Sequence, residues 1–306
     1  MTLIVIGGAT ASGKSALALD VAERIGAEIV NADSMQLYKG MDIGTAKVPF
    51  EERRGIPHHM LDTLEVTQES SVADYQREAR ALIDSRLAQD IPVVVVGGTG
   101  LYIKALIDEL NFPERDPDVR ERLFAESEEF GATAMHQRLA ALDADAAALI
   151  PEQNLRRVIR ALEVIELTGE PYAASLPRDE RSYYPQAKQF AIRVEREVLN
   201  ARISERVAQM WRDGFVFEVE RLVVQGLRDG RTARAAIGYA QVLAALEGQI
   251  STEHALEETV TSTRQYARRQ GTWFTREPRI TWLEGPREEL LERILVSAGN
   301  ESSEKF

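Results

Sequence analysis

The chain has 306 residues, 44% of them hydrophobic, which is enough for one large or two modest domains with a buried core. It has no cysteine, which excludes disulfides and thiolate metal sites and would suit a reducing compartment. The formal net charge of −12 argues against a protein coated in positive potential, so a polyanionic partner would have to meet a local basic patch.

The N-terminus leads directly from Met1 and Thr2 into an apolar segment. It lacks the basic region and the long apolar run of a signal peptide. No stretch reaches the length needed to span a membrane. We therefore expect a cytoplasmic protein without a membrane partner.

The first fifteen residues predict a strand, a glycine-rich turn and the start of a helix. The strand is Leu3 to Ile6, and the turn matches the pattern G-x-x-x-x-G-K-[ST] through Gly8, Ala9, Thr10, Ala11, Ser12, Gly13, Lys14 and Ser15. In this pattern backbone N–H groups and the helix N-terminus bind an oligophosphate, the lysine neutralises it, and the serine hydroxyl can ligate magnesium. We expect a phosphate chain on this loop with magnesium on Ser15. The alternative is a tight turn that merely carries Lys14 and Ser15.

Further strands are predicted at residues 28–32 and 93–96, and helical stretches alternate with them. This alternation is typical of an α/β fold: a P-loop-type, doubly wound parallel sheet with flanking helices. The carboxyl ends of parallel strands share one edge, where ligands bind. The phosphate loop, Asp33 and Thr99 should therefore lie on one rim.

Asp33 is the candidate general base, because it follows a strand end within plausible reach of a phosphate-linked substrate. The alternative is a turn residue or a helix cap. An NTP-hydrolysing P-loop enzyme usually has an aspartate at the end of an apolar strand, but the strand at 93–96 ends in Gly97, Gly98 and Thr99. This ending disfavours NTP hydrolysis.

The composition shifts near Pro113, and helix-like segments follow up to Pro185. One of them opens at Asn154 and carries Arg156, Arg157 and Arg160 beside an apolar face. These arginines either form a solvated helix face or contact the phosphates of a nucleic acid.

The second half is predicted to contain a strand at 189–194, helices near 203–211 and 218–224, a glycine joint at 235–239 and a long helix near 253–270. Arginines and aromatic residues then alternate between Arg264 and Arg279, against a single acid, Glu277. Such a mixture suits stacking and phosphate contact on RNA, although arginines that bridge the protein's own helices are the alternative.

We therefore expect a P-loop core in residues 1–112, a helical insertion domain in 113–185 that contacts tRNA, completion of the core with C-terminal helices in 186–298, and a frayed tail in 299–306. The tRNA part of this expectation comes from a family resemblance.

The chain resembles the tRNA dimethylallyltransferase family, also called tRNA isopentenyl transferases. The resemblance covers nearly the whole chain and lies in ordered blocks at residues 8–15, 33–38, 41–47, 57–59, 97–102, 157–163, 237–239 and 263–270. It implies transfer of a dimethylallyl group from dimethylallyl diphosphate to the exocyclic amine of the adenosine just 3′ of the anticodon.

The resemblance also implies roles for individual residues. Asp33 accepts the proton from the amine, Thr99 lies close to the modified nucleotide, and Lys14 with the loop amides and magnesium stabilises the departing diphosphate. The implied partner is the anticodon stem-loop of tRNA, contacted by Asp33, Ser34, Met35, Gln36, Thr99, Arg120, Arg156, Arg157, Arg160, Arg234, Gly238, Tyr239, Arg268, Arg269 and Gln270. We expect a monomer. The alternative functions are prenylation of free adenine nucleotides and a P-loop, ATP-binding kinase or switch.

Overall fold

The computed structural model describes residues 2–113, 115–172 and 181–299. The chain divides into two compact units: Met1–Ile107 with Tyr183–Phe306, here the core unit, and Asp108–Ser182, here the insertion unit. The tail that we expected to fray lies outside the described residues, apart from Gly299.

The core unit is built on a six-stranded sheet whose strands pair in the order β3-β2-β4-β1-β5-β6. Every neighbouring pair is parallel, which confirms the predicted α/β fold. The strands are β1 (Leu3–Gly8), β2 (Glu28–Asn31), β3 (His58–His59), β4 (Val93–Val96), β5 (Lys188–Ile192) and β6 (Thr281–Leu283).

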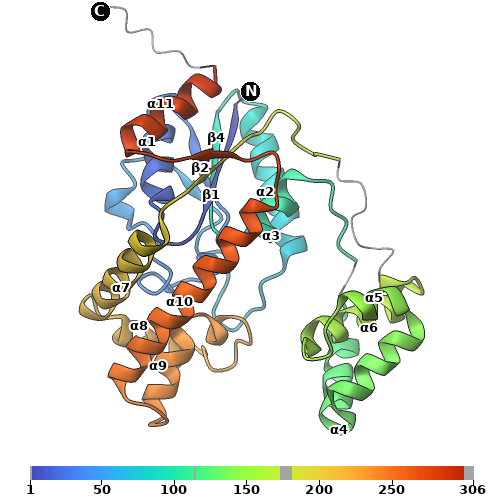
Figure 1. Cartoon of the computed structure of the whole chain (residues 1–306). Helices are drawn as coiled ribbons and strands as arrows, with labels where there is room; N and C mark the ends of the chain where they lie inside the picture. Colours follow the sequence, from blue (N-terminus) through green and yellow to red (C-terminus); the bar gives the residue numbers. More distant parts are fainter. Residues whose placement is uncertain (1, 114, 173–180, 300–306) are drawn as a thin grey trace, which may run out of the picture. The chain divides into compact units, whose positions relative to one another are not determined.

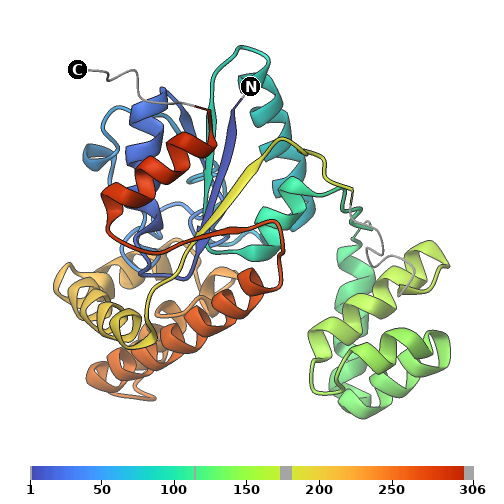
Figure 2. The same cartoon turned by 45° about the horizontal axis from the view of Figure 1, so that its top comes forward.

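Helices cover both faces of the sheet (Figure 2), and alternate residues of the strands pack against opposite helix layers. Leu3 and Val5 pack with α2 (Val72–Leu87) and α3 (Gly100–Ile107). Ile4 and Ile6 pack with α1 (Lys14–Ile25) and α11 (Arg287–Ser297). Because both faces are covered, the β-branched runs of β1 and β4 are buried, as the sequence predicted.

A layer of helices lies at the carboxyl edge of the sheet, in the lower part of the core unit in Figure 1. It contains α7 (Arg196–Arg212), α8 (Phe215–Val224), α9 (Tyr239–Leu246) and α10 (Thr252–Thr275). Short 3-10 helices occur at Phe50–Glu52 and Ala233–Ala235. The helix α10 contacts β1, α3, α7 and α9, and it therefore closes the edge on which ligands bind.

The insertion unit is helical, with α4 (Pro117–Leu142), α5 (Ala144–Leu149) and α6 (Leu155–Thr168) around its own apolar core. The helix α4 is interrupted at Gly131, whose φ of 82° and ψ of 165° are not helical. The helix α6 follows Asn154 and ends at Gly169, as the sequence predicted.

Some elements escaped the sequence-based prediction. The strands β3 and β6 have two and three residues, too few for an alternating pattern to stand out. The helix α11 was also missed. Within the described ranges, no helix is both long and apolar enough to cross a bilayer.

Candidate active site

The phosphate loop is held from behind by apolar contacts. Ala9 and Ala11 pack against Ile203, Val207 and Ala267 of α7 and α10. Ala11 has a φ of 62° and Gly13 a φ of 95°, so the loop makes a tight turn into α1. Its shape is thus set by packing, before any ligand contributes.

The loops after β2 and β4 interlock beside the phosphate loop. The N–H of Thr99 donates to the carbonyl of Ala32 at 3.2 Å, and the N–H of Ser34 donates to Thr99 Oγ1 at 3.1 Å. A Cβ on Gly97 would lie 2.2 Å from the oxygen of Ala32, so only glycine permits this approach. The same close approach explains why β4 cannot end in the aspartate of an NTP-hydrolysing enzyme.

Asp33 and Lys14 line one small cavity of about 50 Å³, together with Ser15, Gln36 and Arg206. Burial raises the pKa of Asp33, and the charge of Lys14 opposes this shift. Burial lowers the pKa of Lys14 to about 8, against the attraction of Asp33. The two groups therefore line one cavity, and each favours the charged form of the other.

The Asp33 carboxylate also accepts a hydrogen bond from the N–H of Met35, at 3.0 Å from Oδ1. The turn role that the sequence left open is therefore present alongside the position facing Lys14. This hydrogen bond fixes the direction of the side chain and leaves the carboxylate in the cavity.

Arg206 is a site residue that the sequence analysis missed. It lies on α7, its Nη1 is 3.5 Å from Thr10 Oγ1, and the structure gives it no ion pair with any described residue. Burial lowers the pKa of its guanidinium. The sequence contains one signal for Arg206, which is its position between the apolar residues Ile203 and Val207 of the same helix. A cation buried on an apolar helix face is costly unless it interacts with another polar group.

A larger cavity of about 330 Å³ shares Thr10, Asp33 and Arg206 with the smaller one and extends to Tyr266. Burial and the charge of Asp33 raise the pKa of Tyr266 to about 12, so its hydroxyl stays protonated at neutral pH. The nearby side chains of Thr99 and Gln270 favour the ionised form and oppose part of this rise in pKa. Tyr266 is thus a second residue of the site absent from the sequence-based set.

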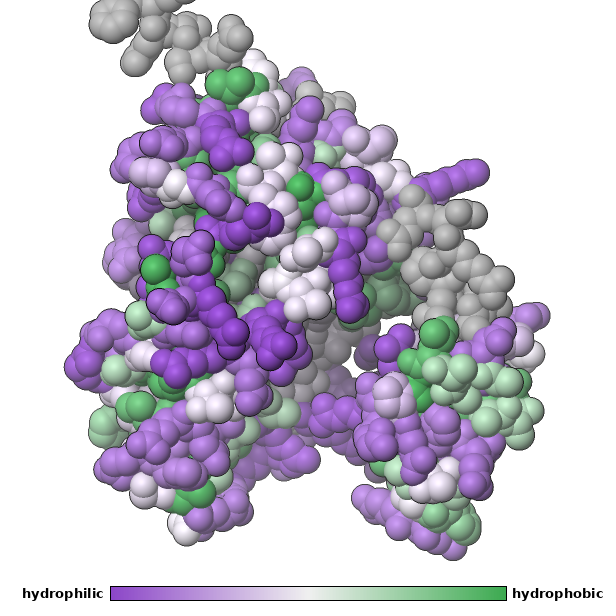
Figure 3. Space-filling model, in the orientation of Figure 1, coloured by the Kyte–Doolittle hydropathy of each residue, from purple (hydrophilic) through white to green (hydrophobic). Residues whose placement is uncertain are grey.

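The exposed side of α10 carries the predicted arginine and aromatic surface. Arg268 and Arg269 are exposed and line a groove of about 410 Å³ with Trp273 and Arg276. Hydrophilic side chains cover this face of the core unit, including the surface over α10 (Figure 3). Arg269 also borders the larger cavity, so the basic surface reaches the site.

Gln270 and Tyr239 are buried and have hydrogen-bond partners inside the protein, and their expected contact with tRNA stays a prediction. Gln270 accepts from the N–H of Thr10 at 2.8 Å and donates to the carbonyl of Gly98 at 2.9 Å, tying two rim loops together. The Tyr239 hydroxyl donates to Glu218 Oε1 at 2.6 Å. Gln270 is 4% and Tyr239 0% exposed, and Tyr239 also borders the larger cavity. Gly238, also expected to contact tRNA, is likewise buried.

The remaining predicted tRNA contacts differ in exposure. Arg156 and Arg157 are exposed on α6, and Arg120 on α4 is partly buried. Arg160 instead pairs with the buried Glu163 at 2.9 Å and donates to the carbonyl of Pro113 at 2.7 Å, so it stabilises the insertion unit itself. In the core unit, Arg234 is exposed and donates to the carbonyl of Arg228 at 2.9 Å.

The donor set fits magnesium held mainly by a phosphate ligand. Ser15 brings a hydroxyl to the small cavity, and Asp33 is the carboxylate there. Among the described residues there is no group of three or more His, Cys, Asp or Glu side chains that could hold a metal alone. Magnesium typically keeps several waters and binds through one or two protein oxygens plus substrate phosphates, which matches this set.

Comparisons with known proteins point to one family. The family model described as IPP transferase matches residues 36–277. A tRNA dimethylallyltransferase of Thermobifida fusca strain YX is 54% identical over 300 residues, 96% of this chain and 93% of that relative. One of Streptomyces griseus is 52% identical over 283 residues, 92% of this chain and 90% of that relative.

Solved structures are similar as well. The tRNA isopentenylpyrophosphate transferase of Bacillus halodurans superimposes with a TM-score of 0.71 at 37% identity, covering 98% of this chain and 96% of that one. A eukaryotic dimethylallyltransferase acting on tRNA gives a TM-score of 0.81 at 24% identity, covering 99% of this chain and 81% of that one. The second likeness supports the fold.

Proposed function

The chain belongs to the IPP transferase family, and we propose that it transfers a dimethylallyl group from dimethylallyl diphosphate to the exocyclic amine of the adenosine 3′-adjacent to the anticodon in tRNA. The observation that carries this proposal is the pairing of Lys14 with Asp33 in one cavity. In this proposal the phosphate loop binds the diphosphate, the Asp33 carboxylate accepts the proton, and the reacting carbon and nitrogen lie between them.

The reaction balances with these two groups. The amine nitrogen of adenosine forms a bond to the first carbon of the dimethylallyl group. The bond between that carbon and the diphosphate oxygen breaks, and its electron pair leaves with the diphosphate. The amine loses a proton to Asp33 as positive charge develops on the nitrogen.

The phosphate loop, Lys14 and Arg206 bind the diphosphate and stabilise the charge that it gains on leaving. Thr10 lies beside Arg206 on the same side of the cavity. Magnesium, held by Ser15 and the phosphates, would supply further neutralisation of the leaving group. Tyr266 and Asp33 line the larger cavity on the adenine side, and Thr99 Oγ1 accepts a hydrogen bond from the N–H of Ser34, which lines the same cavity.

The target base must leave the stacked anticodon loop, which costs a few kcal/mol. Contacts of the exposed arginines Arg268 and Arg269 with RNA phosphates offset this cost, and Arg156 and Arg157 of the insertion unit add to them. We further propose that the enzyme acts as a monomer in the cytoplasm. Size-exclusion chromatography with light scattering tests the oligomeric state.

The decisive experiment is incubation of the protein with radiolabelled dimethylallyl diphosphate and unmodified tRNA, followed by nucleoside analysis. We expect label in a single modified adenosine. Parallel reactions contain free AMP in place of tRNA, or ATP in place of the prenyl donor. Prenylated AMP without modified tRNA would favour the nucleotide-prenylating alternative, and ATP turnover without tRNA would favour a kinase or switch.

A further inference from the structure

The loop from Met41 to Lys47 forms a wall of the site without belonging to the phosphate loop. Thr45 and Ala46 line both the small cavity and the larger one. The carbonyl of Thr45 accepts a hydrogen bond from Gln36 Nε2 at 3.0 Å. The position of this loop therefore determines the orientation of the Gln36 side-chain amide toward a substrate.

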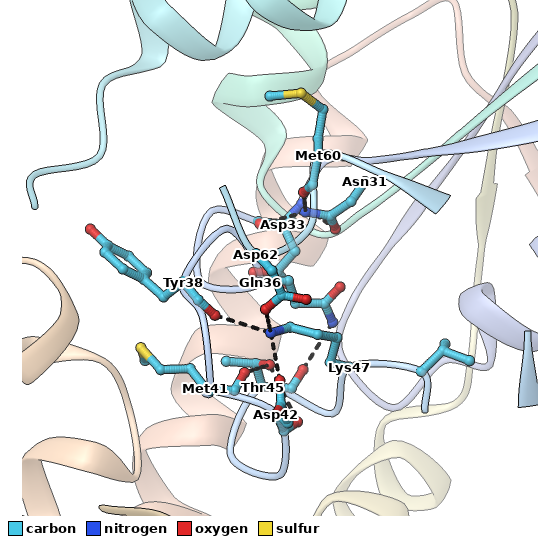
Figure 4. A network of polar contacts seen from close by, with 12 residues as sticks. Asn31, Asp33, Gln36, Tyr38, Met41, Asp42, Thr45, Lys47, Met60 and Asp62 are labelled. Carbon is cyan, nitrogen blue, oxygen red and sulfur yellow. Dashed lines mark hydrogen bonds and ion pairs between the residues drawn. The ribbon is translucent and has the colours of Figure 1, made fainter. Parts of the chain in front are cut away.

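A buried lysine holds the loop from one side. Lys47 Nζ donates to the carbonyl of Tyr38 at 3.0 Å, to Asp42 Oδ1 at 2.6 Å and to Asp62 Oδ1 at 2.7 Å (Figure 4). Its side chain is only 3% exposed. All three ammonium donors thus have acceptors in the protein, and they join the two ends of the loop to each other, to Tyr38 just before it and to the separate segment at Asp62.

A buried carboxylate holds the same loop from the other side. Glu218 of α8 accepts from the N–H of Asp42 at 3.1 Å, of Ile43 at 2.7 Å and of Gly44 at 3.2 Å. The Tyr239 hydroxyl donates to the same carboxylate at 2.6 Å. Hydrogen bonds to a charged group are stronger than those between neutral groups, so this contact is a firm anchor.

The backbone around Lys47 is strained, which shows that these anchors are needed. Ala46, Met60 and Asp62 have φ values of 51°, 57° and 55° although none is glycine. Each such residue costs about 1–3 kcal/mol and persists only where surrounding contacts over-determine it. Asn31 adds a further contact by donating from Nδ2 to the carbonyl of Met60 at 2.9 Å.

These contacts fix which end of the Gln36 side-chain amide, the nitrogen or the oxygen, faces loop 41–47. The carbonyl of Thr45 has no proton, so its partner must be the amide nitrogen, and Figure 4 shows this nitrogen turned toward Thr45. Gln36 lines the small cavity with Asp33, and its amide oxygen accepts no hydrogen bond from the part of the chain that the structure describes, so it is free to accept one from a ligand. An acceptor suits the exocyclic amine of adenine and opposes the carbonyl oxygen of a 6-oxopurine.

We propose that Lys47 and Glu218 are positioning residues: they hold loop 41–47 so that Gln36 presents its amide oxygen to the exocyclic amine of the target adenine. This inference rests on the proposed function. It assigns these two buried charges to recognition of the base and leaves diphosphate binding to Lys14 and Arg206.

The test is steady-state kinetics of Lys47→Met with both substrates varied, alone and combined with Gln36→Leu. Lys47→Met should fold, because Asp42 and Asp62 have side chains 50% and 42% exposed and can be solvated. We expect kcat/KM for tRNA to fall roughly 10–100-fold while the KM for dimethylallyl diphosphate stays within about twofold. In the Gln36→Leu background the same change should cost less than about threefold, because coupled residues are not additive.

The matched control is Lys39→Met, which removes a lysine of the same segment whose ion pair with Glu65 is exposed. It should keep normal kinetics. The conservative Lys47→Arg should recover part of the lost activity toward tRNA. Should Lys47→Met not fold, Tyr239→Phe removes one hydrogen bond from Glu218 and should lower kcat/KM for tRNA by about two- to fivefold.

Discrimination gives a second readout. Wild-type enzyme should bind an anticodon stem-loop with adenosine at the target position more tightly than one with guanosine, and Lys47→Met should reduce this preference. Additive effects in the double variant, or equal losses toward both substrates, would overturn the inference. A wild-type enzyme that does not prenylate tRNA would instead overturn the proposed function.

Discussion

The charged residues at the two ends of the active site differ in the hydrogen bonds that they make with the rest of the protein. At the phosphate end, Lys14 Nζ donates to the carbonyl of Ala9 at 3.3 Å, and Arg206 Nη1 is 3.5 Å from Thr10 Oγ1. At the adenine end, Lys47 and Glu218 have short hydrogen bonds to several groups of the protein. The first pair of contacts is long and the second set is near ideal.

This difference teaches what each charge is for. Lys14 and Arg206 are desolvated without full compensation, as their lowered pKa values record. We expect an incoming diphosphate to supply the missing negative charge. Lys47 and Glu218 already have hydrogen-bond partners within the protein, so their contribution is to fix the position of loop 41–47. Variants at the two ends should therefore fail in different kinetic parameters.

The largest effect is expected for Asp33→Asn, at the boundary between the two ends. The amide cannot accept the proton from the amine, so kcat should fall by about two to four orders of magnitude. Affinity for tRNA, measured by filter binding, should remain near normal because the side chain keeps its size. Turnover close to wild type would remove Asp33 from the mechanism.

Removal of the phosphate-end cations should give the next largest effect. Lys14→Met should lower kcat/KM for dimethylallyl diphosphate by roughly 10²–10³-fold, the range seen when one donor to a developing anion is lost. Arg206→Met should act in the same direction and leave binding of tRNA unchanged. Isothermal titration with inorganic diphosphate checks both variants, with Lys39→Met as control. Unchanged diphosphate affinity in both would contradict the division of labour between the two ends.

The phosphate end should lose its affinity for dimethylallyl diphosphate at high pH. Lys14 is charged below its pKa of about 8 and neutral above it, so the Kd for dimethylallyl diphosphate should rise up to about tenfold per pH unit above that value. Binding itself restores the proton by favouring the cation. At low pH, kcat/KM should instead fall as Asp33, whose pKa is raised by burial, becomes protonated. Lys14→Met should abolish the alkaline limb, which titration at several pH values measures.

The phosphate end could be predicted from the sequence and the adenine end only in part. The residues expected to bind phosphate lie next to one another between Gly8 and Ser15, so a local sequence pattern is enough to identify them. Arg206 reaches the same cavity from α7, far along the chain, and nothing local marks it except an apolar neighbourhood.

The adenine end depends on distant contacts as well. Asp33 and Thr99 could be placed on one rim because parallel strands share an edge. The bond from Tyr239 to Glu218 could not be foreseen, because a tyrosine beside a glycine joint predicts exposure as readily as burial. The two hydrogen bonds by which the Gln270 amide joins Thr10 to Gly98 could not be foreseen either, because these residues lie far apart in the sequence.

The smallest effect is expected in the insertion unit, where two arginines on α6 differ as the two ends of the site do. Arg156 is exposed and has no hydrogen bond or ion pair with the residues that the structure describes, whereas Arg160 neutralises Glu163, which is 0% exposed. Arg156→Ala should therefore weaken tRNA binding only a few-fold. It should reduce the slope of log affinity against log salt by about 0.7–0.9, the loss of one phosphate contact.

Arg160→Ala should instead leave a buried carboxylate without its cation and lower the free energy of unfolding of the insertion unit by roughly 1–3 kcal/mol. Denaturation followed by circular dichroism, together with tRNA binding at several salt concentrations, separates the two variants. An unchanged salt slope for Arg156→Ala would return that arginine to the solvated face of α6. A reduced slope for Arg160→Ala without loss of stability would instead give that residue the phosphate contact, despite its partner inside the protein.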